Sequence, residues 1–429
     1  MTTTAFLEGL EQRTQDIFDR CTRCGKCVDV CPMTEAADVD VTDSKAVIKA
    51  TLDILGGGKG SVAAERWATK CSLSGACIRA CEDGVNPRFM LSLVRAQIGK
   101  RAGDEASRRS SVKAFQDMSQ GVKVLSRLQL PPDLLLQLGQ LPDADDGQET
   151  PDVVFYTGCN VLRTPHIALL ALDIMDALGV SYRVMGGPSH CCGVIQLRTG
   201  DTANSGRMGE STLSKFSATK TGKVLSWCPS CMIQMDEFAM PSADPSNTGF
   251  DLTMFVSFLE SRIDDLKALM TRPVNKRVGL HEHSSVEEVN KTAIKLLEAV
   301  PGVEYVNLEQ PIIGYSCTGL KAMPDYKKEL HQGQLQAAAD LGVTTLAGVY
   351  HVCHRELCSH ENDWPFEVVN FLEIIGESMG IHRPDIFKRY RMSQDADVVI
   401  AETQDLADAN GLAPDEVRDV IENQWILGR

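Results

Sequence analysis

Five cysteines in the middle of the chain constrain its fold more than any other feature. Cys159 is followed after 31 residues by the adjacent pair Cys191 and Cys192, and after 35 more by Cys228 and Cys231. Adjacent cysteines rarely bridge each other, because the small ring distorts the peptide. Scattered buried thiols and a four-thiolate zinc site are alternatives, but the fifth cysteine argues against zinc. The pattern predicts one metal site, built from three separated segments.

A second group of cysteines, near the N-terminus, has the spacing of a bacterial two-cluster ferredoxin. Cys21, Cys24, Cys27 and Cys31, followed by Pro32, form the run Cys-x2-Cys-x2-Cys-x3-Cys-Pro. In this run three thiolates bind one cluster and the fourth reaches the other cluster. We therefore expect iron–sulfur clusters in this part of the chain.

The matching run further along keeps three of its four cysteines. Cys71, Cys77 and Cys81 retain the spacing, but Ser74 replaces the second cysteine and Glu82 replaces the proline. The crossed pattern assigns the first cluster to the first ferredoxin set, which is Cys21, Cys24, Cys27 and Cys81. It assigns the second cluster to the second ferredoxin set, which is Cys31, Cys71 and Cys77 with Ser74 at the fourth corner.

Three outcomes are open for the second ferredoxin set. It can hold a three-iron cluster, [3Fe-4S], or a four-iron cluster, [4Fe-4S], that Ser74 or water completes, or no cluster. Three well-placed thiolates argue against the last outcome. The motif resembles three-cysteine variants in the iron–sulfur subunits of succinate dehydrogenases, and this resemblance favours the three-iron cluster.

Composition restricts the class of protein. The chain has 429 residues, of which 15 are cysteines, whereas disulfide scaffolds are short and secreted. Its first residues lack the apolar core of a secretory signal, and it has no apolar run long enough to span a membrane. We expect a cytoplasmic protein with no transmembrane segment. A net charge of −15 argues against nucleic acid or anionic lipid as a partner.

From residue 153 onward the chain repeats a strand, a cysteine and a helix three times. The expected strands are residues 153–156, 182–185 and 224–226. This rhythm predicts a parallel α/β unit with its ligands at the carboxyl ends of the strands. The rhythm returns with expected strands at residues 277–280, 304–306 and 346–351. Helices are expected at residues 4–19, 44–55, 63–68, 87–102, 165–178, 202–217, 286–300, 324–341 and 366–379.

A shift of 125 residues aligns the two repeats without a gap. It places Ser284, Ser316, Cys317, Cys353 and Glu356 at the positions of the five cysteines, in that order. The second repeat therefore keeps two of five thiols. Its remaining polar residues suit zinc or form a vestigial pocket, and we favour the pocket. The residues that converge in the zinc alternative are His281, His283, Cys317, His351, Cys353, His354, Glu356 and Cys358.

The five-cysteine spacing resembles the CCG cysteine-rich domain of heterodisulfide reductase B subunits, which also occurs in glycolate-oxidase-type iron–sulfur subunits. The whole chain resembles fused C and B subunits of that reductase. This resemblance implies that Cys159, Cys191, Cys192, Cys228 and Cys231, the five-cysteine set, hold a non-cubane [4Fe-4S] cluster. The expected fold is α+β and multidomain: an all-helical two-cluster ferredoxin domain at residues 1–105, a helical connector and linker at 106–150, a cluster-binding CCG half at 151–272, and a degenerate CCG half with a helical tail at 273–429.

The expected function follows from what the chain lacks as well as from its thiols. No Gly-x-Gly-x-x-Gly motif marks a flavin or nicotinamide site, so the clusters must exchange single electrons with a partner. The resemblance implies an electron-transfer subunit with a flavin-dependent dehydrogenase or demethylase as its partner; a small electron carrier is also possible. The alternative is a heterodisulfide reductase-like subunit that reduces a disulfide or sulfur substrate at the five-cysteine set. The second half lacks three thiolates, which favours electron transfer.

Overall fold

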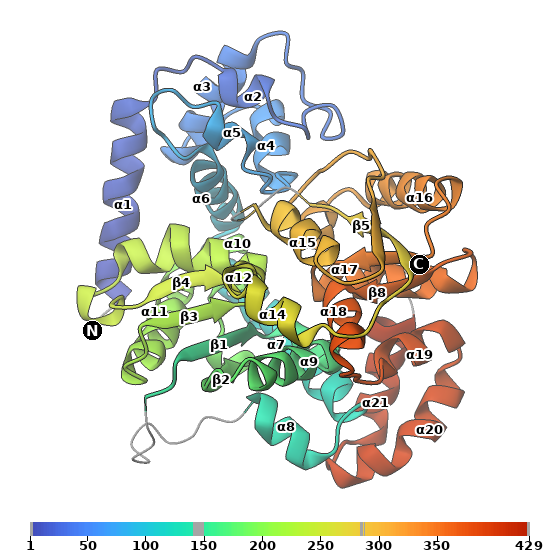
Figure 1. Cartoon of the computed structure of the whole chain (residues 1–429). Coiled ribbons are helices and arrows are strands. Elements are labelled where there is room, and N and C mark those ends of the chain that lie inside the picture. Colours follow the sequence, from blue (N-terminus) through green and yellow to red (C-terminus); the bar gives the residue numbers. More distant parts are fainter. Residues whose placement is uncertain (1–2, 140–149, 284–285, 287, 427–429) are drawn as a thin grey trace.

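The computed structural model describes residues 3–139, 150–283, 286 and 288–426. It combines an N-terminal helical region with two parallel sheets and a helical C-terminal region (Figure 1). The predicted fold class, helices first and two α/β units after them, is confirmed. The domain boundaries stay predictions.

The N-terminal region consists of helices and loops, with no strand among its described residues. A short helix begins directly after the glycine of each cysteine motif. Gly25 and Gly75 have φ angles of 86° and 75° there, a conformation that favours glycine over other residues. The buried side chains of Ile48, Trp67 and Val94 form its core. The helices are α1 (Thr3–Arg20), α2 (Lys26–Asp29), α3 (Ser44–Leu55), α4 (Val62–Thr69), α5 (Ala76–Arg79) and α6 (Pro87–Lys100).

Helix α6 docks the N-terminal region onto the first CCG half. The rings of Phe89 and Phe238 lie 4.8 Å apart, and Arg88 forms a 2.6 Å ion pair with Glu237. Asn86 donates a second hydrogen bond to the same carboxylate. Removing one partner of such a buried pair leaves an uncompensated charge, so the contact fixes how the two parts are oriented.

The first sheet has four parallel strands in the order β2-β1-β3-β4. Its strands are β1 (Val153–Gly158), β2 (Tyr182–Gly186), β3 (Lys223–Ser226) and β4 (Asp251–Met254). Helices α9 (Pro165–Ala177), α10 (Val194–Arg198), α11 (Thr202–Ala218), α12 (Pro229–Gln234), α13 (Phe255–Ser261) and α14 (Ile263–Leu269) accompany it. Helix α1 packs against α11, where the Phe6 ring fills the space that a side chain at Gly206 would need.

The second sheet repeats this topology, with parallel strands in the order β6-β5-β7-β8. Its strands are β5 (Lys276–His281), β6 (Val303–Val306), β7 (Thr345–Gly348) and β8 (Glu367–Asn370). The accompanying helices are α15 (Val289–Glu298), α16 (Pro324–Asp340), α17 (His351–Leu357) and α18 (Phe371–Met379), with the short turn η6 (Cys317–Leu320). The internal repeat expected from the sequence is therefore confirmed.

Two predictions at the strand ends were wrong, and one strand was missed. The expected helix at 366–379 begins with strand β8, and only from Phe371 onward is it helical, where Asn370 and Glu373 form a capping box. Strand β4 was not predicted. The strand expected at 346–351 ends at Gly348, and His351 opens helix α17. Strands β4 and β8 lie at the sheet edges, where each pairs with one neighbour only, and such short strands carry little alternation, so their sequence signal is weak.

The gapless alignment of the two repeats fails at the third loop. Tyr156 pairs with Ser226, and His281 pairs with Gly348, so the second repeat takes 67 residues where the first takes 70. Cys228 is the residue before α12, and Tyr350 is the residue before α17. Cys353 therefore takes the place of Cys231, and Tyr350 takes the place of Cys228. The predicted equivalence of Cys228 with Cys353 was wrong, and so was that of Cys231 with Glu356.

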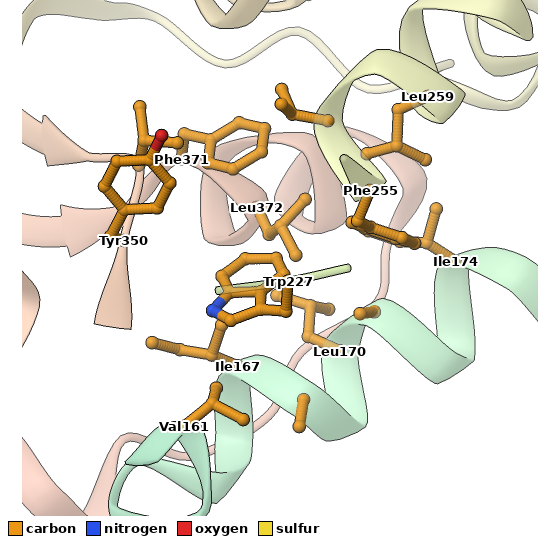
Figure 2. Close-up of a cluster of buried hydrophobic side chains, with 14 of the residues drawn as sticks. Val161, Ile167, Leu170, Ile174, Trp227, Phe255, Leu259, Tyr350, Phe371 and Leu372 are labelled. Atoms are coloured by element: carbon orange, nitrogen blue, oxygen red, sulfur yellow. The ribbon is translucent and has the colours of Figure 1, made fainter. Parts of the chain in front are cut away.

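Both halves contribute to one continuous core. Figure 2 shows Ile167 and Leu170 of α9 and Trp227 of the first half facing Tyr350 and Leu372 of the second half. All five side chains are at least 96% buried. The relative placement of the two sheets is thus determined by packing, since interiors tolerate few voids.

The C-terminal tail packs against the connector helix α7 (Asp104–Arg127). Val417, Val420, Ile421 and Trp425 of the tail pack against α7. The tail consists of α19 (Ile386–Ser393), α20 (Ala396–Ala409), α21 (Pro414–Val420) and the final turn η8 (Ile421–Ile426). Helix α8 (Pro132–Gly139) follows α7 and precedes the predicted linker. Residues 140–149 of that linker lie outside the described part. Among the helices that the structure describes, none combines the length and apolarity that crossing a bilayer requires.

We expect Leu372→Ala to lower the free energy of unfolding by about 2–5 kcal/mol, because it leaves a cavity between the two halves. Leu341→Ala is the matched control, since Leu341 is 42% exposed, and its effect should stay within about 0.5 kcal/mol. Chemical denaturation measures both values. Equal effects of the two substitutions would contradict a shared core.

Candidate metal centres

The thiols of the first ferredoxin set lie together at the surface of the N-terminal region. Cys24 is exposed, Cys27 is buried, and Cys21 and Cys81 are half-buried. Burial raises the pKa of the Cys27 thiol to about 12, and the charges of the other three thiols of the set act in the same direction. Such mutual destabilisation of thiolates is relieved when a cation binds them.

The second ferredoxin set keeps the backbone of the first. Arg23 and Leu73, at matching positions, both have positive φ, and each donates its backbone N–H to the cysteine two residues before it, Leu73 to the Cys71 sulfur at 3.4 Å. Ser74 is 9% exposed and occupies the place that Cys24 has in the first motif. Burial raises the pKa of Cys77 strongly, and Cys71 and Cys31 add to the shift. The structure thus brings Cys31, Cys71 and Cys77 together, and the division of the thiols between two clusters stays a prediction.

The five-cysteine set comes from the carboxyl ends of three neighbouring strands. Cys159 follows β1, Cys191 and Cys192 follow β2, and Cys228 and Cys231 follow β3. Neighbouring thiols shift each other's pKa values along the order Cys159, Cys191, Cys192, Cys231, Cys228, so the five lie side by side. All five are soft donors at one point, a composition that suits an iron–sulfur cluster.

Two glycines leave room for these thiols. A Cβ at Gly158, where φ is 67°, would lie 3.0 Å from the Cys231 sulfur. A Cβ at Gly193, where φ is 86°, would collide with the backbone of Ser205. Only glycine meets both demands, positive φ and close approach. The Gly193 N–H also points to the Cys191 sulfur at 3.5 Å, as expected for a ligand that carries negative charge.

A cavity of about 370 Å³ lies between the five-cysteine set and the second half. Its second-half wall includes Ser316, Thr318 and Tyr350. Charged side chains also line it, namely Arg163, Arg198, Lys321, Lys327, Arg355 and Glu356. Burial and the nearby Arg355 lower the pKa of Arg163 to about 9. The excess of cations favours anionic species beside the thiols.

The second ferredoxin set and the five-cysteine set are joined through a short polar bridge. Tyr315 accepts a 2.7 Å hydrogen bond from Arg198 and lies 2.8 Å from the Ser230 hydroxyl, within the Cys228 to Cys231 turn. The backbone N–H of Tyr315 donates to the carbonyl of Ser72, next to Cys71. Cys71 and Ser230 both line one small cavity, of about 30 Å³.

Four of the eight residues named for the second half converge. The ligand atoms of His281, His283, Cys317 and Cys353 all lie within 4.8 Å of one another, and all four side chains are buried. His281 and His283 come from the end of β5, Cys317 from η6 and Cys353 from α17.

The other four contact different partners, so the zinc alternative does not hold for all eight residues. His351 accepts a hydrogen bond from Trp227, His354 pairs with Asp385, and Glu356 pairs with Lys327. Cys358 is buried among the apolar side chains of the tail. Ser284, the predicted counterpart of Cys159, lies outside the described residues.

Sequence analysis missed two groups of residues. Tyr315 and Arg198 bridge two sites but belong to no motif. His166 and Asp385, with His354 and Glu373, form a second cluster between the halves, in which both histidines are buried and both carboxylates are partly exposed. Although burial alone lowers the pKa of His166, Asp385 and Glu373 outweigh it and raise this pKa. These residues are far apart in sequence, so no spacing could have indicated their contact.

We expect Ser74→Cys to complete the second ferredoxin set. If that set holds a three-iron cluster, the variant should bind one more iron atom per chain and lose the EPR signal of an oxidised three-iron cluster, because the new thiolate ligates the fourth iron. Ser72→Cys is the matched control, because it adds a thiol two residues away from position 74. Residue 72 is not a ligand position of the motif, and its backbone carbonyl accepts a hydrogen bond from Tyr315. Identical spectra for both variants and the parent would show that residue 74 does not face a cluster.

Two family models match the chain. Residues 17–85 match a 4Fe-4S dicluster domain, and residues 153–236 match a cysteine-rich domain. Both ferredoxin motifs lie within the first match up to Glu82, and the whole five-cysteine set lies within the second. The chain therefore binds iron–sulfur clusters; the type of each cluster stays a prediction.

Curated relatives align along most of the chain. The D subunit of the dihydromethanophenazine:CoB–CoM heterodisulfide reductase of Methanosarcina barkeri is 22% identical over 85% of this chain and 94% of its own length. Its counterpart in Methanosarcina mazei gives the same values. The B subunit of the fumarate reductase (CoM/CoB) of Methanothermobacter marburgensis is 24% identical over 71% of this chain and 60% of its own length. The chain is thus an iron–sulfur protein that unites a 4Fe-4S dicluster domain with a cysteine-rich domain and is similar to heterodisulfide reductase D subunits.

Proposed function

We propose that the chain is an electron-transfer subunit that passes single electrons between a partner and the five-cysteine set through the two ferredoxin sets. The observation that carries this proposal is the bridge from Cys71 through Tyr315 to Ser230. Iron–sulfur clusters, when bound, supply one-electron redox chemistry. The chain's own residues set the order of the sites and the charge around them.

The order of the sites runs from the surface inward. Cys24 is exposed, so the first ferredoxin set is accessible to a partner. Burial, Cys71 and Cys31 raise the pKa of Cys77, and the charge of Cys27 adds to this shift, which supports placing the two ferredoxin sets side by side. Cys191, Cys192 and Cys231 are buried at the other end. Cys24 therefore makes the first ferredoxin set the most accessible of the three to a protein partner.

Positive charge along this route favours reduction of the inner sites. Arg95 lies near Cys71 and Arg198, and Arg198 lies near Cys192 and Cys228. Because the Arg guanidinium keeps its proton at physiological pH, both side chains stabilise added electrons. Since the chain has no recognisable motif for a two-electron cofactor, we propose a flavoprotein subunit as the partner that docks near Cys24. The relatives are named as subunits of reductases, which supports a partner subunit.

Interrupting the second ferredoxin set tests this order. After rapid mixing with a reduced two-cluster ferredoxin, a donor too large to reach the buried thiols, Cys77→Ala should leave reduction of the first site unchanged. Reduction of the five-cysteine site should slow by more than an order of magnitude, because the intermediate site is lost. EPR of freeze-quenched samples follows each site.

Cys358→Ala is the control, because it removes a buried thiol that belongs to none of the three sets. Its kinetics should equal those of the parent. If the five-cysteine site of Cys77→Ala is reduced at the rate of the parent, the proposed order is wrong.

The charged cavity favours a second candidate, reduction of a small anionic disulfide at the five-cysteine set. Arg163, Lys321 and Lys327 would bind the anion next to Cys159 and Cys192. A disulfide takes up two electrons and two protons and leaves two thiols, so the ferredoxin sets would deliver the electrons singly. Two relatives named for a CoB–CoM heterodisulfide support this candidate.

The same protein separates the two candidates. With reduced methyl viologen as donor and the CoB–CoM heterodisulfide as probe, the second candidate requires thiol formation that Cys192→Ser abolishes. No thiol formation by the parent, together with normal reduction of all three sites, leaves electron transfer to a partner as the function.

A further inference from the structure

The four converging residues of the second half have the composition and spacing of a tetrahedral metal site. His281 Nε2 lies 3.2 Å from the Cys317 sulfur, and His283 Nε2 lies 3.0 Å from the Cys353 sulfur. His283 Nε2 also lies 3.7 Å from the Cys317 sulfur. Around zinc, with bonds of about 2.0–2.1 Å to nitrogen and about 2.3 Å to sulfur, tetrahedral ligands are about 3.5 Å apart. The observed separations bracket this value.

Charge balance favours a divalent ion in this place. All four side chains are at most 5% exposed, and a buried uncompensated charge is costly. Two thiolates and two neutral imidazoles carry a charge of −2, so one divalent cation makes the site neutral. Imidazole and thiolate together are donors that zinc prefers. A Rieske [2Fe–2S] cluster also uses two histidines and two cysteines, but there the two histidines bind one iron and the two cysteines the other. Here each histidine lies 3.0–3.2 Å from a cysteine sulfur, which fits one shared ion.

Neighbouring residues hold the ligands in the state that a metal needs. The side-chain amide nitrogen of Gln334 donates to the carbonyl of Leu280. This hydrogen bond turns the side-chain oxygen of Gln334 toward His281. His281 Nδ1 donates to that oxygen. The proton is therefore on Nδ1, and Nε2 faces Cys317 with a free lone pair, as in most histidine–metal sites. His331, 3.4 Å from the Cys317 sulfur, can donate to the thiolate from outside the four ligands.

We propose that His281, His283, Cys317 and Cys353 form a zinc site that replaces an iron–sulfur cluster in the second half. This site goes beyond the electron-transfer function, since zinc has no redox chemistry in proteins. It links the end of β5 with η6 and α17. Ser316 and Thr318 flank one ligand and Val352 flanks another, and all three line the cavity beside the five-cysteine set. The zinc ion would therefore hold the wall of that cavity in place.

Metal analysis and zinc X-ray absorption of the intact, anaerobically purified protein test the proposal. We expect one zinc atom per chain, with two sulfur ligands at about 2.3 Å and two nitrogen ligands at about 2.0–2.1 Å. His283→Ala and Cys353→Ala should each lose this zinc and keep the iron content of the parent. Cys358→Ala should keep both metals, because Cys358 lies among the apolar side chains of the tail.

Two results would overturn the site. A zinc spectrum with four sulfur ligands would mean that zinc has entered the ferredoxin or five-cysteine sets instead. Absence of zinc from the parent, or full zinc content in Cys353→Ala, would show that these residues do not bind it. The spectrum of the parent decides the question even if the variants fail to fold.

Discussion

The carboxyl ends of the strands in both parallel sheets meet at one cavity, and the arrangement of the sites depends on this constraint. Parallel sheets place their ligand-binding loops at that edge. Cys159, Cys192 and Cys228 line the cavity from the first sheet, and Tyr350 and Ser316 line it from the second. The shared core around Trp227 and Leu372 keeps the two edges facing each other. The repeat thus makes one chamber from two halves that carry different ligands.

Burial and charge then decide what each half can bind. Five thiols in one buried group repel each other as anions, and cations must compensate them. In the first half Arg163 and Arg198 stand beside the thiols, while in the second half two imidazoles replace thiolates and lower the negative charge. Tyr350 occupies the place of Cys228, so the loop keeps its shape after losing a ligand. One backbone therefore supports a thiol-rich site and a mixed nitrogen and sulfur site.

The sequence predicted the parts whose signal is local. Strands of β-branched and aromatic residues followed by cysteines indicated the parallel sheets, and Cys-x2-Cys spacing indicated the ferredoxin motifs. The alignment of Glu356 with Cys231 failed because three residues are missing between β5 and β7, which no gapless comparison can detect. Tyr315, Arg198 and Gln334 could not be predicted, because they act only by touching a ligand or bridging two sites. The contact of His166 with Asp385 depends on how the halves pack, and this is not encoded by any spacing.

Magnetic interaction between neighbouring sites tests the central claim, that the second ferredoxin set lies directly beside the five-cysteine set. In the fully reduced protein, the EPR signal of the five-cysteine site should be broadened and should relax faster because an electron spin occupies the adjacent ferredoxin site. In Tyr315→Phe, which keeps the ring and removes the hydroxyl that contacts Arg198 and Ser230, the broadening should persist, since the distance between the sites is unchanged. An unbroadened, slowly relaxing signal in the parent, with all sites fully loaded and reduced, would contradict the account.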